Sequence, residues 1–139
     1  MARIMAIDMG RRRCGIAVTD PAQIVAGGLD TVGTGDLAAY VAAYVAREPV
    51  ELIVVGEPRD MQGRPSDSTR YIEPALARLR KAVPTVPVVR YDERFTSVLA
   101  HRAMLDGGLG RMQRRDKALV DKISATIILN DYLESKKTL

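Results

Sequence analysis

The sequence has few of the side chains that build histidine or cysteine sites. It holds one cysteine, Cys14, and one histidine, His101, in 139 residues. One cysteine excludes an internal disulfide and a cysteine-rich zinc site, and one histidine argues against a histidine metal cluster or a Ser-His-Asp triad. We expect Cys14 to be a small core residue and His101 to be a surface or packed residue. Carboxylates are therefore the main candidates for chemistry.

Aromatic residues and long apolar runs are also scarce. Aromatics make up 4% of the chain, without tryptophan, which argues against base stacking as the main mode of nucleic-acid binding. Without a run of about 18 apolar residues or a secretory N-terminal pattern, we expect a cytoplasmic protein with no membrane partner. The length predicts a single domain over residues 1–139, and the net charge of +4 mildly favours a nucleic-acid partner.

The spacing of apolar residues predicts alternating strands and helices. The expected strands cover residues 3–9, 15–19, 24–32, 51–55 and 86–91, and the expected helices cover residues 36–47, 69–83, 96–105 and 117–134. Residues 10–15 are too few for a helix and suit a hairpin. This order predicts an α/β protein with a ribonuclease H-like fold, a five-stranded mixed sheet with helices on both faces. A flavodoxin-like sheet is the main alternative, but it would require a helix between the first two strands.

Three acidic residues lie where these elements end or begin. Asp8 closes the apolar run 4–7, where an unpaired buried charge is costly unless a cation or proton accompanies it. Glu93 follows the fifth strand, at the end where open α/β sheets bind ligands. Asp121 lies in the first turns of the last helix. If the three converge, their oxygens suit Mg²⁺ or Mn²⁺ and a two-metal hydrolysis of phosphodiesters.

Each acid also has a simpler interpretation. Asp8 can be a solvated acid at a strand end, and Asp121 can complement the helix dipole. Helical spacing places Ala125 and Ile128 on the side of Asp121, but the opposite side of the same helix is apolar too. Periodicity therefore leaves the orientation of this helix open.

Basic residues form two clusters beside these acids. Arg11, Arg12 and Arg13 follow Asp8 in the expected hairpin and are candidates for binding phosphate through bidentate hydrogen bonds, or else they form a solvated turn. The second cluster follows a glycine-rich stretch and consists of Arg111, Arg114, Arg115 and Lys117. Both clusters predict contacts with a nucleic-acid backbone.

Four segments resemble a known family. Residues 8–20 fit the pattern D-x-G-x-[KR]-R-x-G-[IV]-A-x-[ST]-D, and residues 92–97 fit D-E-R-x-[ST]-[ST]. The glycines and Pro58 of residues 56–63, together with the last helix from Lys117, complete the set in the family's order. The chain thus resembles the YqgF/RuvX family of Holliday-junction-resolvase-like nucleases, which are assigned to processing of the 5′ end of pre-16S rRNA. It departs from the family pattern at Ser124, in place of alanine, and at Glu57, in place of an apolar residue.

The resemblance implies a metal-dependent nuclease in which Asp8, Glu93 and Asp121 are the catalytic acids and bind Mg²⁺ or Mn²⁺. Glu57 is either a fourth metal ligand or an exposed loop acid. The nucleic-acid contacts are expected from both basic clusters and from one further arginine of the second motif, Arg94. Structured RNA is the expected substrate, branched DNA is the alternative, and a non-catalytic ribosome-assembly factor is the second class of function. The expected oligomeric state is a monomer or a homodimer.

Overall fold

The computed structural model describes residues 2–57, 69–92 and 117–137 of the chain. The strands are β1 (Arg3–Met9), β2 (Arg13–Thr19), β3 (Ala26–Gly33), β4 (Val50–Glu57) and β5 (Val88–Asp92). The helices are α1 (Leu37–Arg47), preceded by a short 3₁₀ turn (Thr34–Asp36), then α2 (Thr69–Ala82) and α5 (Lys117–Lys137). The order of these strands and helices along the chain agrees with the predicted order. The helix predicted at residues 96–105 lies outside the described residues.

The five strands form one mixed sheet in the order β3-β2-β1-β4-β5. Strands β1, β2 and β3 are antiparallel neighbours, whereas β4 pairs parallel to both β1 and β5. A tight hairpin joins β1 to β2, so the helix that a flavodoxin-like sheet would need at this point is absent from these described residues. The predicted five-stranded mixed sheet is confirmed.

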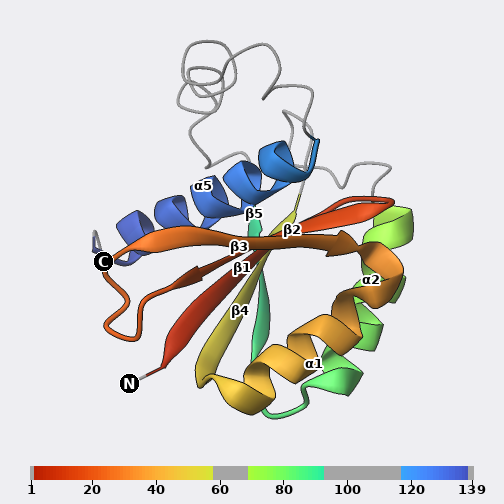
Figure 1. Cartoon of the computed structure of the whole chain (residues 1–139), viewed down its shortest axis with the longest axis horizontal. Coiled ribbons are helices and arrows are strands. Elements are labelled where there is room, and N and C mark those ends of the chain that lie inside the picture. The colour runs from red at the N-terminus through yellow and green to blue at the C-terminus, as the bar shows by residue number, and fades with distance from the viewer. Residues whose placement is uncertain (1, 58–68, 93–116, 138–139) are drawn as a thin grey trace.

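The helices cover both faces of the sheet. Figure 1 shows α5 on one face and α1 with α2 on the other. Alternate side chains of β1 point to opposite faces of the sheet. Ile4 and Ala6 pack in the core under α5, while Met5 and Ile7 pack in the core under α1 and α2. The α5 face continues along the strand to Asp8, which is the next residue of the same parity.

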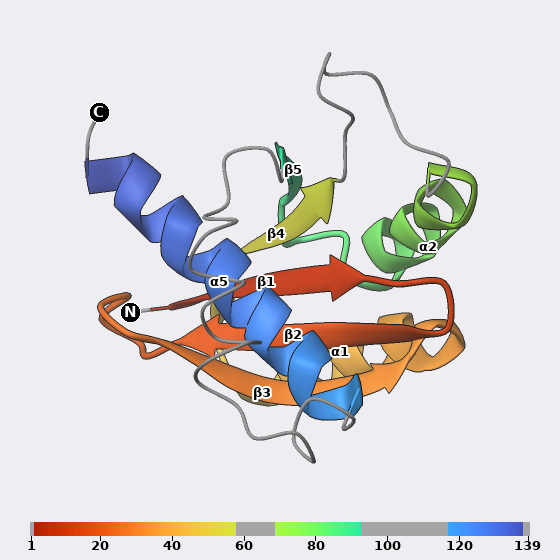
Figure 2. The same cartoon turned by 90° about the horizontal axis from the view of Figure 1, so that it is seen from above.

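The orientation of α5, which periodicity left open, is settled by burial. Ala125, Ile128 and Leu129 are buried against the sheet, which places the stripe that begins at Asp121 on the inner side. Seen from above, α5 crosses over β1, β2 and β3 (Figure 2). No helix in the described ranges has an apolar stretch long enough to cross a membrane.

Four strands begin at residues other than those predicted. β4 begins at Val50 and β5 at Val88, one and two residues from the predicted positions, and β2 and β3 differ as well. β2 starts at Arg13 because Cys14 still pairs with Met9, so the ladder extends into the basic hairpin. β3 starts at Ala26 and includes both glycines that weaken its apolar pattern. The second of them, Gly28, lies under α5, where an added Cβ would approach the Lys122 side chain to 3.3 Å. A residue without a side chain suits this close approach of helix and strand.

Candidate active site

Asp8 is a partly buried acid on the α5 face of β1, where its neighbour in the ladder is Gly15 of β2. Its pKa is raised from 3.8 to about 6, first because burial disfavours the carboxylate and second because the negative charge of Asp121 lies close to it. The structure therefore brings two of the three predicted acids together, one from the first strand and one from the last helix. Charge at this site is costly unless a cation compensates it.

Asp121 is held by contacts between the first turns of α5 and the hairpin strands. Arg13 Nε donates a hydrogen bond to Asp121 Oδ2 over 2.7 Å, which is also an ion pair. On β3, Thr31 Oγ1 donates to the carbonyl oxygen of Ala118 over 2.6 Å. The Asp121 side chain is 21% exposed, so the pair with Arg13 is partly shielded from water. These contacts fix the first described turns of α5 against β2 and β3.

Gly15 is the residue that allows the two acids to meet. A Cβ built at this position would lie 1.9 Å from the carbonyl oxygen of Asp121, well inside any tolerable contact. The helix backbone therefore lies directly on β2 at the position that pairs with Asp8. Glycine is the residue that permits such an approach of two backbones.

We expect Gly15→Ala to displace the first turns of α5 and lower the free energy of unfolding by about 1–3 kcal/mol, the usual cost of overpacking a tight contact. Gly27→Ala is the matched control, because it adds the same methyl group to β3 at a point with no atom within 4 Å. Urea unfolding of both variants measures the difference. Equal stability of Gly15→Ala and wild type would contradict the close contact.

The hairpin between β1 and β2 is a tight turn braced by the 3₁₀ turn that follows β3. The amide of Gly10 donates to the carbonyl oxygen of Arg13 over 2.9 Å, and a Cβ on Gly10 would lie 2.5 Å from that oxygen. Thr34 braces the turn through two bonds, from its hydroxyl to the Gly10 carbonyl and from its amide to the Arg12 carbonyl. The basic segment therefore has a defined backbone, while Arg11, Arg12 and Arg13 are exposed, so the alternative of a solvated turn stays open.

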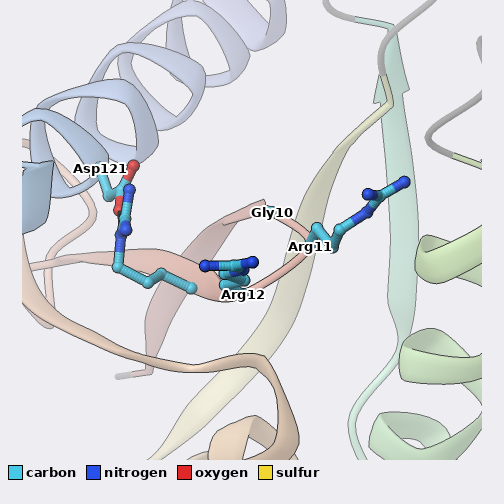
Figure 3. A pocket seen from close by; sticks show the side chains of 5 residues that line it. Gly10, Arg11, Arg12 and Asp121 are labelled. Atoms are coloured by element: carbon cyan, nitrogen blue, oxygen red, sulfur yellow. Dashed lines mark hydrogen bonds and ion pairs between the residues drawn. The ribbon is translucent and has the colours of Figure 1, made fainter.

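A pocket of about 380 Å³ lies between this hairpin and α5. Of the described residues, five line it: Gly10, Arg11, Arg12, Arg13 and Asp121 (Figure 3). Three arginines and one aspartate are among its lining residues, which gives it the net positive charge of a site for an anionic group. Its lining is consistent with phosphate binding by the hairpin arginines.

The three arginines have different surroundings, although the sequence presents them as equivalent. Arg11 points away from Asp121, and its guanidinium carbon lies 5.9 Å from the centre of the Tyr71 ring in α2 (Figure 3). Arg13 is paired with Asp121. Arg12 is exposed, and among the described residues it has no ion-pair partner. Arg12 is thus the arginine best placed to meet an incoming phosphate.

The remaining predicted site residues lie outside the described part of the chain. These are Glu93, Arg94, Arg111, Arg114 and Arg115, together with the side chains of Glu57 and Lys117. Glu93 directly follows Asp92, whose backbone pairs with Glu57 at the end of the parallel strands. Within the described ranges no three acidic, histidine or cysteine residues form a metal-binding group. The predicted third ligand stays a prediction.

The carboxylates that are described fit a hard divalent cation. Asp8 and Asp121 supply only oxygen donors, and the pKa of Asp8 is raised first by burial and second by the nearby charge of Asp121, so a cation would favour the ionised form. Sequence reasoning did not find the Arg13–Asp121 pair or the contact over Gly15. The only sign of either contact in the sequence was that Arg13 and Gly15 lie two residues apart in the motif of residues 8–20.

A family model and the sequences of known proteins point to the same family over nearly the whole chain. The family model described as "RuvX: Holliday junction resolvase" matches residues 2–135. A relative from Phocaeicola vulgatus is 58% identical and one from Parabacteroides distasonis is 54% identical, each over 137 residues that cover 99% of this chain and 98–99% of the relative. Both relatives carry the name "Putative pre-16S rRNA nuclease".

The solved structures give the fold. Thermus thermophilus RuvC in complex with a Holliday junction substrate superposes with a TM-score of 0.63 at 20% identity, covering 98% of this chain and 97% of that chain. A second RuvC structure from the same organism gives a TM-score of 0.60 at 19% identity, over 96% of each chain. The predicted ribonuclease H-like fold is confirmed.

Proposed function

We propose that this chain, which belongs to the RuvX family, is a metal-dependent nuclease that hydrolyses phosphodiester bonds in the 5′ leader of pre-16S rRNA. The substrate class follows the name that its 54–58% identical relatives carry. The observation that carries the proposal is the meeting of Asp8 and Asp121 beside a pocket lined by three arginines. Paired carboxylates next to guanidinium groups suit the hydrolysis of a phosphate ester.

Asp8 and Asp121 would hold Mg²⁺ or Mn²⁺, with Glu93 as the third ligand and Glu57 as a further candidate. A cation bound there supplies an activated water and stabilises the leaving oxygen of the phosphodiester. The carboxylate of Asp8 must be ionised to hold the cation, so we expect cation affinity to fall below about pH 6. The hairpin arginines bind the phosphate of the nucleic acid, and we expect Arg94, Arg114, Arg115 and Lys117 to contribute further phosphate contacts.

Side-by-side cleavage assays test the proposal. The substrates are a pre-16S 5′-leader RNA and a four-way DNA junction, each with Mg²⁺ or Mn²⁺ and each with a chelator control. We expect cleavage of the RNA that depends on the cation. Cleavage of the junction alone would make this chain a resolvase, and binding without cleavage of either substrate would make it a ribosome-assembly factor that only binds nucleic acid.

Arg12→Gln should weaken binding of the leader RNA and reduce the slope of log K against log salt by about one unit, because one fewer phosphate is neutralised. The control is Arg47→Gln, which removes an equal charge from the last residue of α1, where the guanidinium lies over Tyr44. Fluorescence anisotropy over a series of salt concentrations measures both variants. An unchanged slope for Arg12→Gln would remove Arg12 from the binding surface.

A further inference from the structure

We infer that Arg13 is a positioning residue that holds Asp121 in the metal-free protein and competes with the divalent cation for it. Loading of the cation would release the Arg13 guanidinium into the pocket that it shares with Arg12. This inference rests on the proposed function and adds to it a link between cation binding and phosphate binding.

The contact itself is short and specific. Arg13 Nε lies 2.7 Å from Asp121 Oδ2, between residues 108 positions apart, and it connects the first residue of β2 to the second turn of α5. The backbone of Arg13 is fixed on both sides, by the Gly10 amide and by its pairing with Gly33 of β3. Only the side chain is free to move, and 42% of it is exposed.

The charges explain why the contact is temporary. Asp8 and Asp121 place two carboxylates close together, and Arg13 compensates with a single positive charge that is partly in water. This compensation is incomplete, because one positive charge faces two carboxylates. A divalent cation brings twice the charge to both carboxylates and repels a guanidinium beside it. The cation and Arg13 therefore compete for binding to the Asp121 carboxylate.

The released side chain has an obvious new partner. Arg13 and Arg12 line the same pocket, and a guanidinium that loses a carboxylate can bind a phosphate with the same fork of donors. Cation binding at the carboxylates would thus strengthen nucleic-acid binding at the hairpin. By linkage, nucleic acid would strengthen cation binding to the same extent.

Calorimetric titration with Mn²⁺, in the absence of nucleic acid, tests the competition on the full chain. Arg13→Gln should bind Mn²⁺ about threefold to tenfold more tightly than wild type, the range expected when one partly exposed competing ion pair is lost. Arg12→Gln removes the same charge from the same pocket without breaking the pair, so its affinity should change by less than about twofold. Arg13→Lys, which keeps the charge, should stay near wild type.

A measurement on the wild type covers the case in which Arg13→Gln does not fold. The Arg13 Nε proton should exchange slowly with water in metal-free protein and faster after addition of Mg²⁺, as followed by NMR. Unchanged exchange, or equal or weaker Mn²⁺ binding by folded Arg13→Gln, would overturn the inference while leaving the nuclease proposal intact. Wild type that binds neither cation would overturn both, and the cleavage assays would then show no cation dependence.

Discussion

Asp8→Asn should reduce cleavage of the pre-16S leader RNA by at least about a hundredfold, since metal-ion catalysis supplies several kcal/mol of transition-state stabilisation. The substitution keeps the shape of the side chain and removes the charge that would hold the cation. Asp8 lies near the end of a buried strand, on the sheet face that α5 covers, so the Asp8→Asn variant should retain the fold. Binding of the RNA depends mainly on the arginines and should be largely kept.

The matched control is Glu51→Gln, which neutralises an exposed acid near the start of β4. That variant should cleave like wild type. Cleavage rates and RNA affinity are measured on the same preparations, which must be free of contaminating nuclease. Equal cleavage by wild type and Asp8→Asn would remove the enzymatic function and leave a protein that binds nucleic acid.

The frame of the fold was predictable because its signals are local. The apolar run before Asp8, the short basic connection after it and the continuous strand at Ile53–Val55 each specify an element without reference to the rest of the chain. Alternation along β1 even gives the face on which Asp8 lies, since every second residue shares a face. The element order then selects the ribonuclease H-like sheet.

The side chains of the site were predictable only in part, because their environments depend on residues distant in sequence. The orientation of α5 was ambiguous, and it was decided by the packing of Ala125 and Ile128 on the sheet. The three arginines look alike in sequence, but Tyr71 of α2 and Asp121 of α5 give Arg11 and Arg13 different surroundings. No local pattern encodes a contact across 108 positions.

In metal-free buffer, Asp8→Asn should be more stable than wild type at about pH 7.5. The pKa of Asp8 is raised to about 6 in the folded protein from an ordinary value of 3.8, so between these values the folded state binds more protons than the unfolded state. The free energy of unfolding of wild type therefore falls as the pH rises from about 4 to 6, and the loss is complete above that range. A shift of this size corresponds to about 2–3 kcal/mol.

Urea unfolding of both proteins in chelator, at pH values from about 3.5 to about 8, measures how the free energy of unfolding depends on pH. The asparagine side chain of the variant does not titrate, so the two stability curves should separate with rising pH and converge below about pH 4. Mg²⁺ or Mn²⁺ at the upper end of this range should then stabilise wild type by binding preferentially to the folded state, and should stabilise Asp8→Asn less. Curves that stay parallel over the whole range would mean that Asp8 ionises in the folded protein without cost. The burial of Asp8 beside Asp121, on which the candidate site depends, would then be wrong.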